Sequence, residues 1–337
     1  MTYKHWIEPK GIFIMNIPVD WQYKNDIVEG FEEISPYSFV RYGNASGAFQ
    51  ISCYKISEKG NPEWPVYETK VIYENWLKVI KNYDDGYEII FHYAQIDDTL
   101  VMVKIISEPD ERDEQDFESQ LEFSKQVMSS VTIIPKCDRE LAVKHRAYDN
   151  FMSSIMAAFD LRNRAKENLS VIEVVILTSN IIDAYLRLSI VMTTQLINVS
   201  DDFDVKYLFE GETGKGRSEG KIYSEANQLK IIDETELEAL NSLYRRRNKV
   251  VHRFLISKIR TNDVIKLADD YNSVLEWITV KLKSIEDEQI DAGVGLYSVG
   301  YSKDYVPTNE DRSIVISMAM DKHVNPRLND DLFLADK

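Results

Sequence analysis

The sequence predicts an α+β protein, in which an N-terminal α/β sandwich of antiparallel sheet and helices precedes a C-terminal bundle of four helices. Three observations predict this fold. Residues 1–136 contain short segments that alternate between apolar and polar residues, as half-buried strands do. Residues 137–285 contain long segments with apolar residues at helical spacing. Residues 286–337 form an acidic tail with possible short strands at 293–301 and 312–320.

The strands expected in the first region are short and end at turn residues. In the segment 47–56, for example, Phe49, Ile51 and Cys53 alternate with more polar residues. Asp97 and Asp98 make a turn pair suited to a hairpin. Strands are expected at 11–21, 38–42, 47–56, 87–95, 99–108 and 131–135, and helices at 66–83 and 117–130.

The order of these elements, together with the motif IPVDW at residues 17–21, resembles the PsbP-like α/β sandwich family. The resemblance covers roughly residues 5–135. It implies a fold and a role in molecular interactions, and it carries no catalytic chemistry.

Long helical patterns begin after Pro135. Helices are expected at 138–168, 170–198, 233–256 and 261–285, with a short helix ending near Lys230, and helices of this length favour a bundle. The segment 170–199 is apolar enough to suggest a membrane span, but charged residues interrupt it at positions 173, 183 and 187. We therefore expect a buried helix and no membrane association.

Charge and cysteine content narrow the classes of function. The net charge of -16 argues against broad affinity for nucleic acids. The segment 137–285 is nevertheless neutral, with 22 basic and 22 acidic residues, so this part would not repel RNA. Two cysteines, far apart, offer no disulfide framework or zinc spacing, and the N-terminus lacks a signal-peptide core. We expect a cytoplasmic protein that uses no metal or cofactor.

The segment GETGKGRS, residues 211–218, is one residue away from a P-loop motif. A phosphate could bind to the backbone N–H groups of such a loop. However, Arg217 stands where the motif requires lysine, and the surroundings predict helices rather than a parallel sheet. A connection between two helices is the preferred interpretation.

The segment YRRRNKVVH, residues 244–252, places many cationic side chains in one helix. At helical spacing, Arg247 falls at the centre of an apolar stripe, and Asn248 and His252 share the adjoining face. The stripe comprises Leu240, Leu243, Tyr244, Arg247, Val250, Val251, Phe254 and Leu255. A guanidinium inside a bundle requires a partner or a cleft. One interpretation is therefore an ion pair between Arg247 and Asp183 or Glu173, with the other charges in solvent.

The other interpretation is a polar site. RNKVVH, residues 247–252, resembles the R-x4–6-H motif of the HEPN superfamily, and the helices of residues 138–285 resemble its bundle. This resemblance implies metal-independent RNA cleavage by a homodimer whose two motif helices meet across a two-fold axis. It also suggests a bacterial toxin or phage-defence setting, with a protein partner such as an antitoxin.

The residue types suit that chemistry. His252 can transfer a proton near neutral pH, Arg247 can grip a phosphate, and Asn248 can orient either group. Four further residues, Arg245, Arg246, Lys249 and Arg253, can contact the RNA backbone. The alternative is a non-catalytic module for dimerisation or protein interaction, in which Arg247 forms a structural ion pair.

Overall fold

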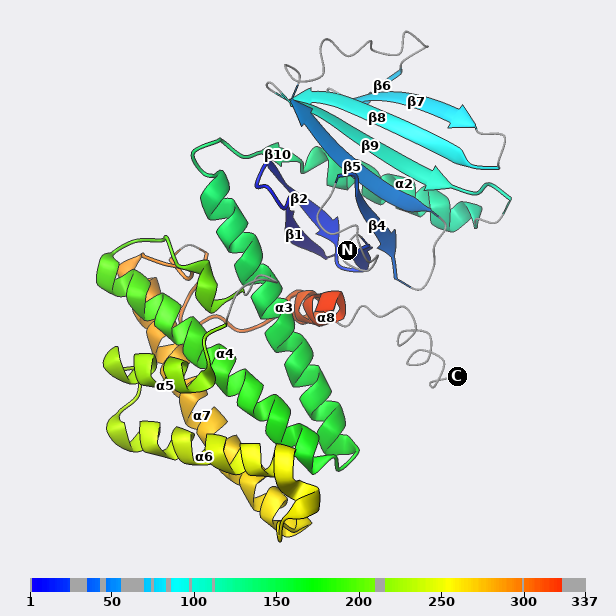
Figure 1. Ribbon diagram of the computed structural model, residues 1–337. Coiled ribbons are helices and arrows are strands. Elements are labelled where there is room, and N and C mark those ends of the chain that lie inside the picture. The colour runs from blue at the N-terminus through cyan, green and yellow to red at the C-terminus, as the bar shows by residue number, and fades with distance from the viewer. Residues whose placement is uncertain are drawn as a thin grey trace. The chain divides into compact units, whose positions relative to one another are not determined.

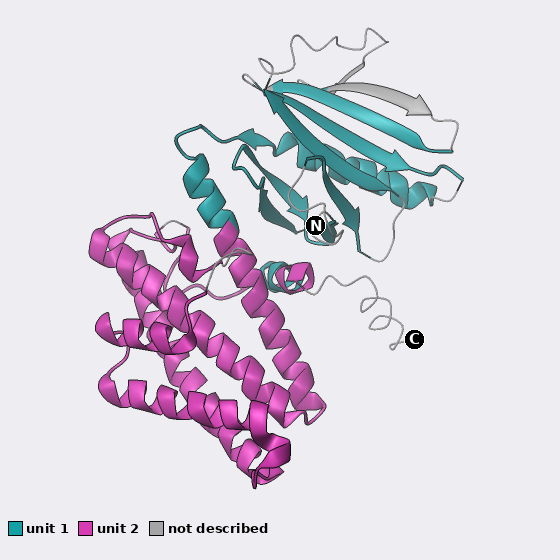
Figure 2. Ribbon diagram, in the orientation of Figure 1, with its two compact units in different colours: residues 1–146, 310–317, 323–337 teal, residues 147–309, 318–322 magenta. Residues whose placement is uncertain are grey.

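The computed structural model describes residues 2–24, 35–42, 47–55, 70–73, 76–82, 86–96, 99–110, 113–209, 216–298 and 300–322. The chain forms two compact units (Figure 2). One contains residues 1–146 and 310–317, and the other contains residues 147–309 and 318–322. The two units divide within a continuous helix, between Arg146 and Ala147, whereas the sequence pattern changes near residue 136.

The N-terminal unit contains two antiparallel sheets, so the predicted α+β class is confirmed (Figure 1). The smaller sheet has the order β1 (Tyr3–Ile7), β2 (Phe13–Pro18), β10 (Thr132–Ile133). The larger has the order β3 (Trp21–Tyr23), β4 (Tyr37–Arg41), β5 (Ala48–Lys55), β9 (Thr99–Ser107), β8 (Glu88–Ile96), β7 (Trp76–Asn82), β6 (Lys70–Tyr73). The predicted hairpin is confirmed, since Ile96 pairs with Thr99.

One apolar core holds both sheets and helix α2 (Glu114–Ser129) together. The alternating residues of the larger sheet supply its centre, because Phe49, Ile51 and Val103 are fully buried on one face. The helix contributes Phe117 and Val127 to the same core. Asp113 begins the helix, where its side chain accepts a hydrogen bond from the amide of residue 116 at 2.8 Å.

The helix predicted at 66–83 is wrong, because this segment contains strands β6 and β7. The pairing of β7 with β8 is continuous from Leu77, opposite Tyr93, to Asn82, opposite Glu88. The segment is rich in valine, isoleucine, tyrosine and tryptophan, which favour strands, although their spacing also fits a helix. Pairing with the neighbouring strand β8 therefore makes β7 a strand rather than part of a helix.

The second unit is helical and agrees closely with the predicted segments. Its helices are α3 (Arg139–Glu167, which begins in the first unit), α4 (Val171–Asn198), α5 (Glu219–Gln228), α6 (Glu234–Arg253) and α7 (Thr261–Ala292), with 3-10 turns η1 (Val205–Tyr207) and η2 (Phe254–Ile256). Residues from all five helices share one core. The most extensive helix contact joins α4 and α7.

Helix α4 is the only described helix that is long and apolar enough to cross a membrane. Its most apolar window has a mean hydropathy of 1.6, and 61% of that window is buried inside the protein. Ile182 and Ile190, for example, are fully buried against neighbouring helices. These contacts explain the apolar sequence of α4 as that of a core helix.

Both strands suggested for the tail are wrong. Residues 293–298 form turns after α7, where Gly293 ends the helix with a positive φ of 62°. The buried Gln289 side chain holds these turns, since its Oε1 accepts from the Tyr297 amide at 3.2 Å and its Nε2 donates to the Met192 carbonyl at 3.1 Å. The second suggested strand lies within helix α8 (Asn309–Lys322), whose first turn carries Glu310 and Asp311.

Candidate nucleic-acid interface on helix α6

Helix α6 carries the whole motif and has a well-defined beginning. The Asp233 side chain accepts from the Glu236 amide at 2.9 Å, and the Glu236 side chain accepts from the Asp233 amide at 2.8 Å. This reciprocal capping fixes the start of the helix. Leu240, Leu243 and Val250 then face the core at helical spacing. The phase of the helix in turn fixes which motif residues face inward.

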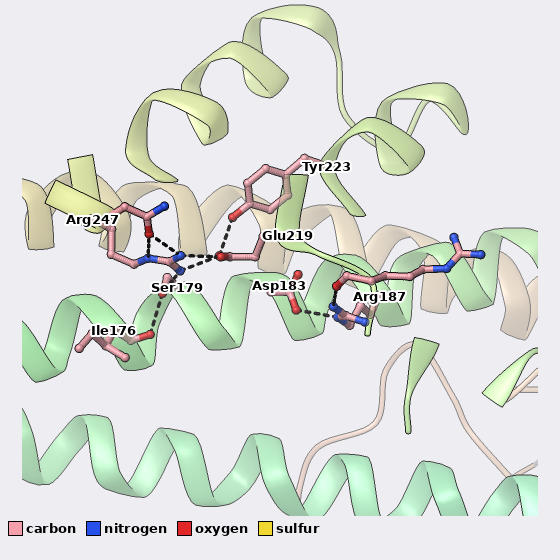
Figure 3. Close-up of polar contacts among 9 residues, drawn as sticks. Ile176, Ser179, Asp183, Arg187, Glu219, Tyr223 and Arg247 are labelled. Atoms are coloured by element: carbon pink, nitrogen blue, oxygen red, sulfur yellow. Dashed lines mark hydrogen bonds and ion pairs between the residues drawn. The ribbon is translucent and has the colours of Figure 1, made fainter. Parts of the chain in front are cut away.

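Arg247 points inward and forms an ion pair with Glu219, the first residue of α5 (Figure 3). Its Nη1 donates to Glu219 Oε1 at 2.8 Å, and its Nη2 lies 2.7 Å from Glu219 Oε2. Nη1 also donates to the Ser179 hydroxyl at 3.1 Å. Nη2 and Nε donate to Asn248 Oδ1 at 3.0 and 3.3 Å. These contacts use all five N–H groups of the guanidinium.

The surroundings of Arg247 favour its charged form. The side chains of Arg247 and Glu219 are 14% and 15% exposed, and the Tyr244 ring lies 4.9 Å below the guanidinium. Burial lowers the pKa of Arg247, but the hydrogen bond and charge of Glu219 outweigh this and raise it above the usual value. Tyr223 donates to the same carboxylate at 3.0 Å, and burial together with Glu219 raises the pKa of Tyr223.

The partner of Arg247 differs from both residues that the sequence suggested. Glu173 is exposed in the first turn of α4, and Asp183 pairs with Arg187 one turn further along that helix, at 2.6 Å. Burial raises the pKa of Asp183, and the Arg187 charge opposes that shift. No spacing pattern in the sequence indicated Glu219 as the partner, because it lies in another helix, directly after a polar connection.

A second set of contacts joins the residues just before α5 to α4. Arg187 donates from Nη2 to the backbone carbonyl of Arg217 at 2.7 Å. The Arg217 side chain forms an ion pair with Glu225 and stacks over the Tyr207 ring at 4.6 Å. In the predicted P-loop-like segment, residues 211–215 lie outside the described residues. The arginine at its end is thus already engaged by a carboxylate and an aromatic ring.

The opposite face of α6 forms an open groove with a volume of about 790 Å³. Its lining comprises Ser242 and six residues of the predicted site, Arg245, Arg246, Asn248, Lys249, His252 and Arg253. Arg247 is the predicted residue missing from this lining. Arg247 influences the groove through Asn248. Because Asn248 Oδ1 accepts a hydrogen bond from Arg247, the two Nδ2 donors of Asn248 remain available to a ligand in the groove. Arg247 thereby orients the amide.

The cations of the groove differ in how far they are already neutralised. Arg246 donates to Asp270 of α7 at 2.6 Å, and Arg245 donates to the Asn241 carbonyl at 3.2 Å. Among the residues that the structure describes, Lys249, His252 and Arg253 make no ion pair or side-chain hydrogen bond. All three are exposed. The groove therefore presents a histidine beside two uncompensated positive charges.

The arrangement suits a phosphate ligand better than a metal ion. Within the described ranges, no group of three or more His, Cys, Asp or Glu side chains could hold a metal. Amide and cationic donors such as Asn248 Nδ2, Lys249 and Arg253 bind anionic oxygens.

Comparisons with known proteins leave the function open. No protein-family model and no curated protein match this sequence. Among solved structures, one from Bacteroides thetaiotaomicron aligns at 13% sequence identity, covering 54% of this chain and 78% of that chain, with a TM-score of 0.29. A likeness at this level carries no inference about fold or function.

Proposed function

We propose that the groove on α6 binds RNA and that His252 takes part in metal-independent cleavage of the RNA backbone. The observation that supports this most is the charge around the groove. Lys249 and Arg253 carry no counter-charge in the described part of a chain whose net charge is -16. A polyanion is the ligand that such an isolated cationic surface attracts.

The proposed reaction uses a nucleophile that RNA itself supplies. The 2′-oxygen attacks the adjacent phosphorus as the bond from phosphorus to the 5′-oxygen breaks, giving a 2′,3′-cyclic phosphate and a 5′-hydroxyl end. One group removes the 2′ proton and another protonates the leaving oxygen. His252 performs one of these transfers. Lys249, Arg253 and the Asn248 amide stabilise the charge on the phosphate.

Two proton transfers require two groups, so the proposal includes a homodimer. A two-fold axis beside α6 would bring His252 of a second copy to the same phosphate. This arrangement, and a four-helix bundle built from α3, α4, α6 and α7, is what the resemblance to the HEPN superfamily implies. The bacterial toxin or phage-defence setting, a cytoplasmic location and an antitoxin-like partner belong to the same proposal.

In this proposal Arg247 is a positioning residue rather than a phosphate ligand. Its five donors are engaged by Glu219, Ser179 and Asn248, so gripping a phosphate would break existing bonds. Its role is to hold the Asn248 amide with both Nδ2 donors directed away from Arg247. This replaces the direct phosphate contact that the sequence motif suggests for the arginine.

Product chemistry tests the proposed function. The protein is incubated with RNA in EDTA, and the ends of the products are identified by mass spectrometry. We expect 2′,3′-cyclic phosphate ends and no cleavage of the same oligonucleotide made of DNA. Products with 5′-phosphate ends, or cleavage of DNA at an equal rate, would contradict the proposal.

A second candidate is a non-catalytic module for dimerisation or protein interaction. The ion pair between Arg247 and Glu219 favours it, because it gives the motif arginine a structural role without any ligand. The two candidates differ in the importance of His252, which makes no hydrogen bond or ion pair within the described residues and which only the first candidate requires for catalysis.

A further inference from the structure

Two large aliphatic side chains protrude from the turn η2 between α6 and α7, at one end of the helical unit (Figure 1). Leu255 and Ile256 are 94% and 83% exposed. We call these two residues the apolar tip. Adjacent aliphatic side chains exposed to this degree are unfavourably hydrated, so the tip gains free energy from contact with an apolar surface.

The turn that carries the apolar tip is fixed on both sides. Phe254 and Ile259 flank the tip and pack against the core of the helical unit. The Arg260 amide donates to the Asp263 side chain at 2.9 Å, which fixes the start of α7. Turning the apolar tip into the core would break these contacts. The tip is therefore held in solvent by the same residues that anchor the turn.

Positive charge lies next to the tip in the same turn. Lys258 and Arg260 are exposed, and neither forms an ion pair with another residue that the structure describes. Residues 239–262 contain no aspartate or glutamate, although the whole chain has a net charge of -16. At about 0.1 M salt the field of a charged surface falls off within about 10 Å, so charges close to that surface matter most. The end of the unit that carries the tip thus attracts an anionic surface.

This combination suits lipid better than a protein or a nucleic acid. One buried leucine or isoleucine side chain removes about 100 Å² from water, so the two side chains supply about 200 Å². A stable protein interface buries about 800 Å² on each partner. A bilayer has no such minimum, because inserted aliphatic groups and cations at the headgroups contribute separately. A nucleic acid would bind the cations but leave Leu255 and Ile256 in water.

We propose that the apolar tip inserts into the interfacial region of an anionic lipid bilayer. The aliphatic stems of Lys258 and Arg260 lie along the apolar surface, and their charged groups bind lipid phosphates. Helix α4 stays in the core of the unit, so the contact is peripheral and no helix crosses the bilayer. The inference does not rest on RNA cleavage.

Flotation of the full-length protein with vesicles tests the proposal. One set of vesicles is phosphatidylcholine alone, and the other contains equal amounts of phosphatidylcholine and anionic phosphatidylglycerol. We expect binding to the anionic vesicles to be about tenfold tighter or more. The pair Leu255→Ser and Ile256→Ser should weaken that binding by about tenfold or more, because the inserted apolar groups are lost. The pair Lys258→Glu and Arg260→Glu should weaken it at least as much, because the charge is reversed.

Two control pairs match these variants elsewhere on the helical unit. Ile197→Ser and Val280→Ser remove two aliphatic side chains that are 63% and 70% exposed and lie outside the tip. Lys221→Glu and Lys230→Glu change the net charge by the same amount as the Lys258 and Arg260 pair, at exposed positions on or next to α5. Both controls should bind the anionic vesicles as the wild-type protein does. Circular dichroism of each variant confirms that the fold is intact.

Three results would overturn the proposal. The first is equal binding to both kinds of vesicle, or no binding to either. The second is binding that the tip and charge pairs weaken no more than their controls do. The third is a dimer, detected by light scattering, that Leu255→Ser and Ile256→Ser dissociate while vesicle binding is unchanged. That last result would assign the tip to a second copy of the chain.

Discussion

Arg247 and Glu219 are joined by two contacts of 2.8 and 2.7 Å, and the same guanidinium also binds the Asn248 amide oxygen. The pair connects the first residue of α5 to the middle of α6. It directs the motif arginine inward while Asn248 and His252 face the groove. One helix therefore helps to hold the helical unit together and, in the proposed function, presents donors to RNA.

Breaking this ion pair should cost stability. Arg247→Ala or Glu219→Ala leaves one buried charge without its partner, at a cost of about 3 kcal/mol in the free energy of unfolding. The double variant should cost less than the sum of the two, because no lone charge remains. Urea unfolding followed by circular dichroism measures all three. The exposed pair Arg246 and Asp270 is the control, and its loss should cost about 1 kcal/mol or less.

Asn248 should matter for RNA affinity and also for stability, because its Oδ1 accepts hydrogen bonds from Arg247 Nε and Nη2. Asn248→Ala removes the Nδ2 donors from the groove, and we expect about a tenfold weaker RNA affinity, the loss of one charge-assisted hydrogen bond. Fluorescence anisotropy with labelled, non-cleavable RNA measures this change. Asn241→Ala, on the same helix outside the groove lining, is the matched control. Equal affinities for the two variants would remove Asn248 from the site.

The cationic residues of the groove should contribute unequally to RNA affinity. Replacing Lys249 or Arg253 with alanine should weaken RNA binding and reduce the slope of log affinity against log salt by about 0.7 for each lost phosphate contact. Arg246→Ala should change the slope less, because Asp270 already neutralises that arginine. Anisotropy titrations at several salt concentrations give the slopes. Identical slopes for the three variants would show that ion pairing on the surface does not decide which cations bind RNA.

Glu286 should make stability depend on pH. Burial raises the pKa of its carboxyl above the usual value, and Lys283 opposes that shift. The folded state therefore binds a proton more tightly than the unfolded state, so this group lowers stability as pH rises from the unfolded pKa through the folded one. Glu286→Gln should stabilise the protein at about pH 7.5, with a smaller difference at about pH 4. The exposed Glu288→Gln, on the same helix, is the control, and an equal effect of the two substitutions at both pH values would refute this role for Glu286.

The sequence predicted the helices of the second unit well, because apolar residues that recur at helical spacing over a long segment are compatible with few other structures. It placed Arg247 on the inner face of α6 and Asn248 with His252 beside it, as the structure shows. The prediction of an inward-facing apolar stripe was wrong at the C-terminal end of the stripe. Val251 and Leu255 were expected inside but are 43% and 94% exposed. Leu255 lies beyond the end of α6 at Arg253, in η2, where the helical spacing no longer applies.

What the sequence could not predict depended on contacts between distant residues. The segment 66–83 fits a helix by its spacing, and only pairing with β8 makes it a strand. Glu219 binds Arg247 from 28 positions away and from another helix, so no periodicity relates them. Gln289 holds the turns after α7 in the same way, through bonds to Met192 and Tyr297.

The measurement that tests the central claim most directly is RNA cleavage by His252→Ala in EDTA, compared with the wild-type protein. His252 is exposed and makes no hydrogen bond or ion pair within the described residues, so the variant should keep its fold, its assembly and its RNA affinity while cleavage falls at least a hundredfold. Equal cleavage by the two proteins would contradict the assignment of His252 and of the α6 groove as the catalytic site.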